Sequence, residues 1–421
     1  MCVVKVPVLE VFALWLTLLR WDASQKLTTA VLSIRHRRPL GGLPAGRFES
    51  TMGNRDERSI NLRGWIFELL LHVRARLRAD CWLYLAIAIY SVIGIALLGT
   101  YGHAEMASFG KYLEQWTYLF LFFMPLMAVI FDYAWVLLRF NGKQSLAKRR
   151  TFSPHRLAHL FSGMLLLMAL MIFQGMFTSI KNLLPLMRGG FLYDEWLARI
   201  DALLAFGFDP WKILVPIARH DVIVKIVDWN YSVLWFVVCF GTLFYVATSP
   251  RAAPVRVRYV GMFMFVWVVC GNIFAGIFIS AGPVFYGAVT GDSQRFAELL
   301  DFLASPDGPT TANMIQRYLW SLHEHGGAGL GSGVSAFPSV HVGLIALNAF
   351  FAAEVSRRLG IIAFGYTALV MASSVFLGWH YLIDGYASLL VVGLGHFALK
   401  ALMNRETRSA ADTQQVAAAA A

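Results

Sequence analysis

The sequence predicts an all-α, polytopic membrane bundle of about eight spans, with amphipathic helices lying on its external surface. Hydrophobic residues make up 58% of the 421 and only 14% are charged, which is far outside the range of soluble domains. Apolar runs also recur at lengths that approach the thickness of a hydrocarbon core, about 30 Å. The expected spans are Cys81–Gly99, Trp116–Leu138, Leu157–Ile180, Tyr231–Thr248, Tyr259–Ser280, Val342–Val355, Ile361–Gly378 and Tyr386–Leu402.

The distribution of positive charge predicts how these spans are oriented. If the loops alternate between two sides, one side holds 27 of the 36 Lys and Arg residues, in 1–80, 139–156, 249–258, 356–360 and 400–421. Such an excess marks the cytoplasmic side, so both termini are expected inside. The net charge of +11 is therefore a topology signal. No basic patch with interleaved aromatic residues indicates a nucleic-acid partner. The short loops favour a bacterial inner membrane over a Golgi-type one.

Four regions are expected along the chain. Residues 1–80 are a basic cytoplasmic region, and 81–156 hold two additional spans and a cytoplasmic loop. Residues 157–402 form the membrane domain that contains the histidine motifs described below, and 403–421 are a disordered cytoplasmic tail. Four cysteines without metal-site spacing give no disulfide framework.

The first fifty residues give a weaker signal. Val11–Leu19 is apolar but only nine residues long and lacks a basic flank or a cleavage site, so a surface-lying helix is favoured over a signal peptide. Met52 begins a polar stretch and is an equally good start of the chain.

Two long external segments are expected. Lys181–Asn230 places aromatic, apolar and acidic residues at helical spacing, with Trp196 and Trp211 expected at headgroup level. These helices are interpreted as a packing scaffold, or alternatively as the wall of a groove for a lipid tail. Ala281–Pro338 ends in a glycine-rich run at 326–333, which either lets backbone amides approach an anion or serves as a plain linker.

Two histidines return to one membrane surface. His341 ends the run Ser335–His341, and His380 follows 39 positions later. Between them the chain crosses with Val342–Val355, turns at 356–360 and crosses back with Ile361–Gly378. The sequence therefore predicts a helical hairpin with both histidines at its external end.

The residues around these histidines suit chemistry on phosphate. Pro338 is expected at the first helical position, so that the N–H groups of Ser339 and Val340, with the Ser339 hydroxyl, form an anion site. His341 then lies where an imidazolium can protonate a leaving oxygen. His380 and Asp384 share a helix face, so the carboxylate fixes the tautomer of a nucleophilic imidazole. Attack on phosphorus would give a phosphohistidine.

Other interpretations of the histidines compete with this one. A bis-histidine haem site leaves Asp384 unexplained, and zinc needs further ligands such as His323 and His325. His159 and His396 are interpreted as interhelical hydrogen-bonders. The expected mechanism needs no cofactor and no metal. Asp132, inside a span, has no obvious partner.

At these residues the chain resembles the type 2 phosphatidic acid phosphatase superfamily, in particular the branch of the inositol phosphorylceramide synthases. The pattern P-S-x-H matches Pro338 to His341, and S-x6-H-x3-D matches Ser373, His380 and Asp384. The resemblance extends more loosely to Lys181, Asp201, 209–211 and 281–283, and so covers about 157–402. It implies that His380 is the nucleophile, Asp384 its orienting carboxylate and His341 the general acid.

The chain departs from the phosphatase members at three expected cations. Gly282-Pro283 stands where they have Arg-Pro, Ala275 stands where their lysine would lie, and Ser374 replaces an arginine. A phosphate in a partly desolvated site still needs countercharge, for which the external candidates are Lys181, Arg188 and Arg317. The losses favour phosphodiester or lipid-linked substrates over simple monoesters.

The sequence thus predicts a lipid phosphotransferase of the inositolphosphotransferase type, whose partners are a membrane lipid substrate and an alcohol acceptor. With water as acceptor, the same site would be a lipid phosphate or diphosphate phosphatase. A non-enzymatic lipid transporter that uses the external groove is the alternative from another class.

Overall fold

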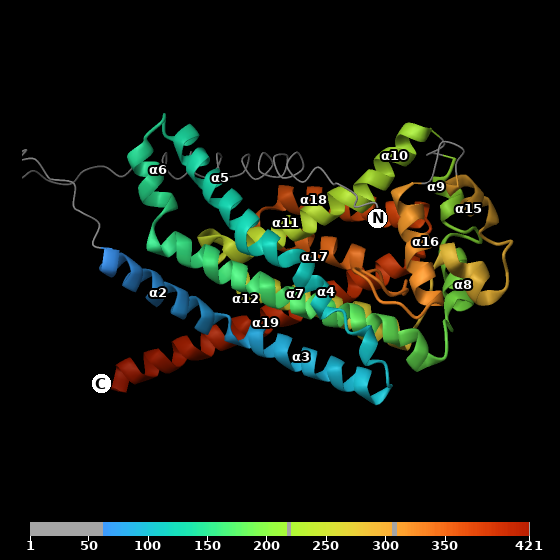
Figure 1. Ribbon diagram of the computed structural model, residues 1–421, viewed down its shortest axis with the longest axis horizontal. Helices are drawn as coiled ribbons and strands as arrows, with labels where there is room; N and C mark the ends of the chain where they lie inside the picture. The colour runs from blue at the N-terminus through green and yellow to red at the C-terminus, as the bar shows by residue number, and fades with distance from the viewer. Residues whose placement is uncertain (1–61, 217–219, 305–309, 421) are drawn as a thin grey trace, which may run out of the picture.

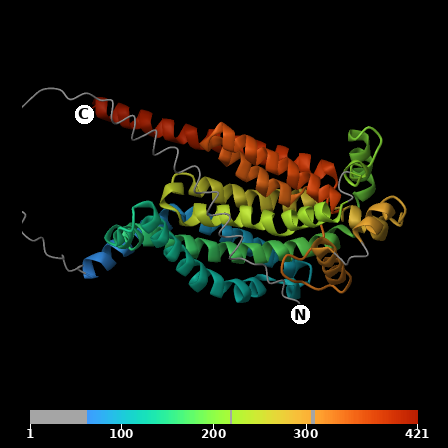
Figure 2. The ribbon, with the colours of Figure 1, turned by 90° about the horizontal axis from the view of Figure 1, so that it is seen from above.

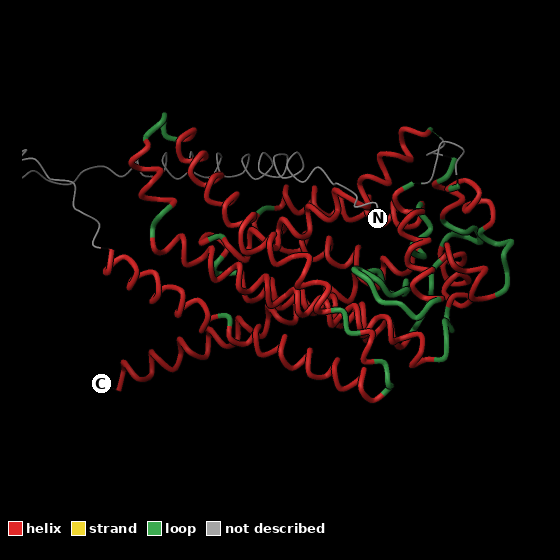
Figure 3. Tube along the Cα trace, viewed as in Figure 1, coloured by secondary structure: helices red, strands yellow, loops and turns green. Residues whose placement is uncertain are grey.

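The structure, a computed structural model, describes residues 62–216, 220–304 and 310–420, and these form helices joined by loops, without a strand (Figure 3). This confirms the predicted polytopic helical bundle. Seven helical stretches in the described residues are long and apolar enough to cross a membrane, and the shorter Val340–Val355 is an eighth apolar helix. The predicted surface helix at Val11–Leu19 and the alternative start at Met52 lie outside the described residues.

The apolar stretches correspond one by one to the eight predicted spans. The long helices run side by side along the long axis of the molecule (Figures 1 and 2). The N-terminal half contains α2 (Leu62–Ala79), α3 (Cys81–Thr100), α4 (Phe109–Tyr118), η2 (Leu119–Phe123), α5 (Met124–Arg139), α6 (Gln144–Thr151) and α7 (Pro154–Arg188). The remaining spans are α10 (Asp221–Trp229), η3 (Asn230–Leu234) and α11 (Trp235–Thr248); α12 (Arg256–Phe265), η5 (Val266–Phe274) and α13 (Ala275–Ile277); α17 (Val340–Val355); α18 (Arg357–Phe376); and α19 (Leu382–Ala420).

Helix α7 is the central element, because it contacts α2, α3, α4 and α11. It begins where the Ser153 hydroxyl accepts a hydrogen bond from the N–H of Arg156, with Pro154 at the first helical position, an arrangement that satisfies a free N–H of the first turn. The helix continues beyond the predicted end at Ile180, passes through Pro185 and ends before Gly189, which has a left-handed φ of +73°. Lys181 and Arg188 therefore lie on α7 rather than in an external loop.

The predicted hairpin is formed by α17 and α18. Ser356 ends α17 and also caps α18, where its hydroxyl accepts a hydrogen bond from the N–H of Leu359 at 3.2 Å. Helix α19 packs against α17 on return. It runs through Ala420, so the disordered tail predicted from residue 403 is corrected to helix. The tail is rich in alanine and contains no glycine or proline after Gly395, which favours continuation of the helix.

One end of the bundle carries the short helices (Figure 1, right). They are α8 (Asp194–Leu204), α9 (Trp211–Leu214), η6 (Pro283–Phe285), α14 (Tyr286–Thr290), α15 (Ala297–Leu303) and α16 (Thr311–Glu324). Trp196 on α8 is 51% exposed, but Trp211 is only 2% exposed and belongs to the core. The prediction that both indoles lie at headgroup level is therefore wrong for Trp211. The amphipathic α10 is likewise not a separate surface helix, since it continues into the span of α11.

Buried and half-buried ion pairs tie the N-terminal helices to the rest of the bundle. The Arg256 guanidinium on α12 contacts the Asp80 carboxylate between α2 and α3 at 2.5 Å, and both side chains are 2% exposed. The same guanidinium donates to the Ser162 hydroxyl on α7 at 3.3 Å. Asp132, which had no obvious partner in the sequence, pairs with Arg156 at 2.5 Å.

Removing Asp80 should destabilise the protein strongly, because the buried Arg256 charge would lose its partner. We expect Asp80→Ala to lower the free energy of unfolding by about 3–5 kcal/mol. The matched control is Arg199→Ala, which breaks an exposed pair with Glu195 and should cost at most about 0.5 kcal/mol. Unfolding titrations in sodium dodecyl sulfate measure both, and similar losses in the two variants would contradict the role given to the buried pair.

Candidate active site

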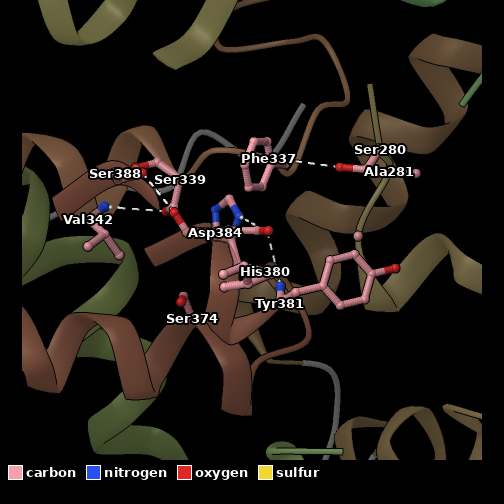
Figure 4. A network of polar contacts seen from close by, with 12 residues as sticks. Ser280, Ala281, Phe337, Ser339, Val342, Ser374, His380, Tyr381, Asp384 and Ser388 are labelled. Atoms are coloured by element: carbon pink, nitrogen blue, oxygen red, sulfur yellow. Dashed lines mark hydrogen bonds and ion pairs between the residues drawn. The ribbon is translucent and has the colours of Figure 1, made fainter. Parts of the chain in front are cut away.

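His380 and Asp384 form a buried pair at the bend between α18 and α19 (Figure 4). The Nδ1 atom of His380 lies 3.2 Å from Oδ2 of Asp384, and the same oxygen accepts the N–H of Tyr381 at 3.0 Å. Asp384 is fully buried and His380 is 6% exposed. The structure brings the two residues together as their spacing predicted, although His380 precedes the helix, which begins at Leu382. The carboxylate fixes which imidazole nitrogen faces away from it.

His341 lies on the first turn of α17. Ser339 is the cap of this helix and accepts the N–H of Val342 at 3.4 Å, so Val340 is the first helical residue. Pro338, expected at that position, precedes the cap instead, after a cis peptide bond. The Ser339 side chain is fully buried. The hydroxyl oxygen thus accepts a bond at the helix start, and the donation of its proton to phosphate stays a prediction.

The starts of α17 and α19 are held together, which brings the two histidines close. The N–H of Ser339 donates to the carbonyl of Asp384 at 3.3 Å, and the Ser388 hydroxyl donates to the carbonyl of Ser339 at 2.8 Å (Figure 4). The ring centroids of His341 and His380 are 6.3 Å apart. Both imidazoles therefore face one small region at the end of the hairpin opposite its turn.

Aromatic side chains from the α10–α11 span fix His341. Its ring lies 4.1 Å from the Trp235 ring and 4.9 Å from the Tyr231 ring, with only 14° between the planes in the second pair. The Trp235 indole N–H donates to the His341 carbonyl at 3.0 Å. These contacts hold the backbone and the ring of His341 in one orientation.

Residues 195–398 match the family model of the PAP2 superfamily. This PAP2 region contains both histidines and Asp384, and the match supports a membrane enzyme of the lipid phosphatase or phosphotransferase type. The comparisons found no matching curated protein and no matching solved structure. The match begins after α7, so it is narrower than the predicted domain of 157–402.

Two carboxylates at the edge of the PAP2 region hold the segment that follows His380. Asp194 accepts the N–H groups of Ala281 and Gly282, each at 2.8 Å, and the Tyr381 hydroxyl at 2.9 Å. Asp201 accepts the N–H of Ile383 at 2.8 Å, and burial raises the pKa of Asp201 to about 7.

Sequence reasoning placed Asp194 and Asp201 on an amphipathic helix but missed these contacts. A signal was present, because the buried positions of α8 are 194, 197, 198 and 201, the spacing of a single buried helix face. A carboxylate on a buried face needs donors. Their identity follows only from the packing.

The structure shows the surroundings of two positions that depart from the phosphatase pattern, Gly282 and Ser374. Gly282 has a φ of +97°, and a Cβ atom there would lie 2.6 Å from the carbonyl oxygen of Trp379. No arginine side chain fits at this position without moving that carbonyl. Ser374 is 1% exposed, and its hydroxyl donates to the carbonyl of Met371 at 2.7 Å. Gly282 thus leaves no room for an arginine, while the buried Ser374 side chain bonds within its own helix.

Of the three candidate cations, Lys181 is the one that the structure brings near the histidines. Burial and the charge of Lys181 together lower the pKa of His380 to about 3. The Lys181 stem passes Gly333, whose φ is +96° and where a Cβ atom would come within 2.9 Å of it. Arg188 and Arg317 are exposed. In the described chain no hydrogen bond or ion pair joins either of them to His341, His380 or Asp384.

The glycine-rich run at 326–333 is anchored rather than a free linker. The N–H of Gly331 donates to the Tyr112 hydroxyl of α4 at 2.9 Å, and that hydroxyl also contacts Thr178 of α7 at 2.7 Å. Lys111 donates to the carbonyl of Ala328. Asn182, which follows Lys181, donates to the Ser332 hydroxyl at 2.7 Å. Helices outside the PAP2 region thus hold the loop that passes Lys181.

The other histidines occupy structural positions. His396 contacts Glu354 across α19 and α17 at 3.1 Å, as predicted for an interhelical hydrogen-bonder. His159 instead contacts the carbonyl of His155 on its own helix at 2.9 Å, so that prediction is wrong. His323 packs against Phe191 and Trp320. Within the described residues, no group of three or more His, Cys, Asp and Glu side chains is arranged to hold a metal ion.

Replacing Asp194 should release the segments on both sides of the site. We expect Asp194→Ala to leave two backbone N–H groups and the Tyr381 hydroxyl without their acceptor, at about 1–3 kcal/mol for each buried donor left unpaired. Hydrogen exchange should accelerate at Ala281 and Gly282. The control is Glu195→Ala on the exposed face of the same helix. Unchanged exchange at both amides in the Asp194 variant would refute the anchoring role.

The charge of Lys181 should be measurable through His380. Because the folded-state pKa is lowered from about 6.5 to about 3, the folded imidazole stays neutral while the unfolded one gains a proton. The folded state therefore becomes less stable as the pH falls from about 6.5 towards 3, because the unfolded chain binds a proton at His380 that the folded chain does not.

We expect Lys181→Met to raise the pKa of His380, since one of its two causes is removed. Imidazole nitrogen shifts in a nuclear magnetic resonance titration would show this, with the His380 signal assigned from its loss in His380→Ala. Lys212→Met, at a surface lysine of α9, should leave the titration unchanged, and an equal shift in both variants would contradict the proximity of Lys181.

Proposed function

We propose that the protein is a membrane-embedded lipid phosphotransferase of the inositolphosphotransferase type, acting through a phosphohistidine on His380. The observation that carries the proposal is the buried His380–Asp384 pair with the His341 ring 6.3 Å away. A buried carboxylate that orients one imidazole beside a second imidazole suits nucleophilic attack assisted by a general acid.

The first step transfers the phosphoryl group to the enzyme. The free nitrogen of neutral His380 attacks phosphorus, and the bond from phosphorus to the lipid oxygen breaks. Protonated His341 donates its proton to that oxygen, so the lipid leaves as an alcohol. The rings of Tyr231 and Trp235 hold the His341 imidazole in place for this transfer.

The second step reverses these roles. Neutral His341 takes the proton of an acceptor alcohol as its oxygen attacks the phosphohistidine, and His380 is released neutral. Lys181 is proposed to supply the main positive charge for the phosphoryl oxygens. A single nearby cation matches the single negative charge of a phosphodiester better than the two charges of a monoester, which favours the transferase over the phosphatase.

The proposed orientation places this chemistry on the external face, with both termini cytoplasmic and the protein in a bacterial inner membrane. The basic residues Lys148, Arg149 and Arg150 of α6 lie at the end of the bundle opposite α8 and α16 (Figure 1). That separation agrees with the excess of positive charge expected on the cytoplasmic side.

The deciding experiment offers the purified protein a panel of labelled phospholipids, with and without inositol, glycerol or ceramide as acceptor. A new headgroup lipid would support the transferase, and free phosphate would support the phosphatase with water as acceptor. We expect His380→Ala to lose about 10⁴-fold or more in kcat, as when a covalent nucleophile is removed. It should also lose the acid-labile phosphate label of the intermediate.

The control variant is His325→Ala, at an exposed position after α16, which should keep full activity. Lipid movement between leaflets that survives in His380→Ala, without any chemical product in the wild type, would instead identify a transporter.

A further inference from the structure

Tyr231 lies where the two catalytic histidines meet. It belongs to the π-helical turn η3 and is 4% exposed. One neighbour is the His341 ring, 4.9 Å away and nearly parallel. Another is the ring of Trp379, the residue before His380, at 6.5 Å with 20° between the planes. The phenol ring is thus fixed between the segments that carry the proposed acid and the proposed nucleophile.

The hydroxyl of Tyr231 is buried and has no hydrogen-bond partner within the described chain. A buried polar group left unpaired costs about 1–3 kcal/mol. The lack of a partner for the Tyr231 hydroxyl therefore requires an explanation. Oδ1 of Asp384 and the indole nitrogen of Trp379 are also buried and unpartnered. Tyr231 is within electrostatic range of Asp384. Three of the buried polar atoms that lack a partner in the described chain thus belong to residues at or beside the site.

Other tyrosines near the external end show what a satisfied hydroxyl looks like here. Tyr381 donates to Asp194 at 2.9 Å, and the Tyr112 hydroxyl bonds to both Thr178 and Gly331. Both hydroxyls join segments that are far apart in the sequence. The hydroxyl of Tyr231 has no such use in the fold, although its ring is packed as tightly.

The site also needs donors. Gly282 leaves no room for an arginine and Ser374 carries no charge, which leaves Lys181 as the cation near the histidines. When phosphorus is attacked, negative charge on its non-bridging oxygens is stabilised by donors that are already in place. A neutral hydroxyl in a water-poor position supplies such a donor without adding a second buried charge.

We propose that the Tyr231 hydroxyl donates a hydrogen bond to a non-bridging oxygen of the phosphoryl group during transfer, in place of one missing cation. This inference rests on the proposed phosphotransfer at His380. It also narrows the substrate to a group with one negative charge on phosphorus, because one cation and one neutral donor match a phosphodiester.

The variant Tyr231→Phe tests this, because it keeps the ring against His341 and removes only the hydroxyl. We expect kcat/KM for the phospholipid turned over in the panel to fall by about 10²- to 10³-fold, the usual loss when one donor to a reacting oxygen is removed. Orthovanadate, which mimics the five-coordinate phosphorus, should inhibit the variant more weakly by a similar factor. A residue with only a structural role would not change vanadate inhibition in parallel with kcat/KM.

The matched control is Tyr366→Phe. Tyr366 on α18 also has a buried hydroxyl without a partner, but it makes no ring contact with either histidine, so activity and vanadate inhibition should stay at wild-type values. The unfolding midpoints of both variants should remain near that of the wild type. A collapse of stability in Tyr231→Phe, with vanadate affinity per folded molecule unchanged, would overturn the proposal.

The inference and the proposed function fail in different ways. If His380→Ala is inactive while Tyr231→Phe keeps wild-type kcat/KM and vanadate inhibition, the role of Tyr231 is wrong and phosphotransfer stands. If His380→Ala retains activity, the proposed function is wrong and the inference falls with it.

Discussion

The site depends on a constraint imposed by α8, whose two buried carboxylates hold the chain on either side of the proposed nucleophile. Asp194 joins residues 281–282 to Tyr381, and Asp201 receives the first turn of α19. These hydrogen bonds fix the segment that connects α18 to α19, which would otherwise be a free connection between two helices. The position of His380 follows from them, and the position of Asp384 follows from the start of α19.

The environment of the site is largely apolar, because aromatic side chains surround His341 and the arginines of the phosphatase members are absent. A site lined by Tyr231, Trp235 and Trp379 is poorly hydrated, and every charge in it interacts strongly with the others. The close approach of Gly282 to the Trp379 carbonyl removes space for an arginine and shapes the backbone beside His380 at the same time. At Gly282 the absence of a cation and the close packing of the backbone thus go together.

The spans, the hairpin and the histidine–aspartate contact could be predicted because each depends on residues close in sequence or on apolar length. The extension of α7 through Lys181 was missed because the hydropathy falls there while the helix continues. The sequence predicts membrane-surface positions for the buried face of α8 and for Trp211. This prediction is wrong because amphipathic periodicity shows that one face is apolar without showing what covers it.

Contacts such as Tyr112 with Gly331 join residues far apart in the chain and follow only from the assembled packing. Tyr231 is a similar case, because it was counted as the first residue of a span. Its position between the histidines depends on how α11, α17 and the bend before α19 pack together.

The contacts between α4 and the glycine-rich loop mean that the edge of the PAP2 match is not the edge of the cooperative unit. Gly331 and Ala328 lie within the matched residues, yet their partners Tyr112 and Lys111 lie well before them. The excised segment would lack the partners of that N–H and that carbonyl, and it would also lack Lys181 on α7. The span that begins with α4 is therefore not an independent module, because it supports the glycine-rich loop.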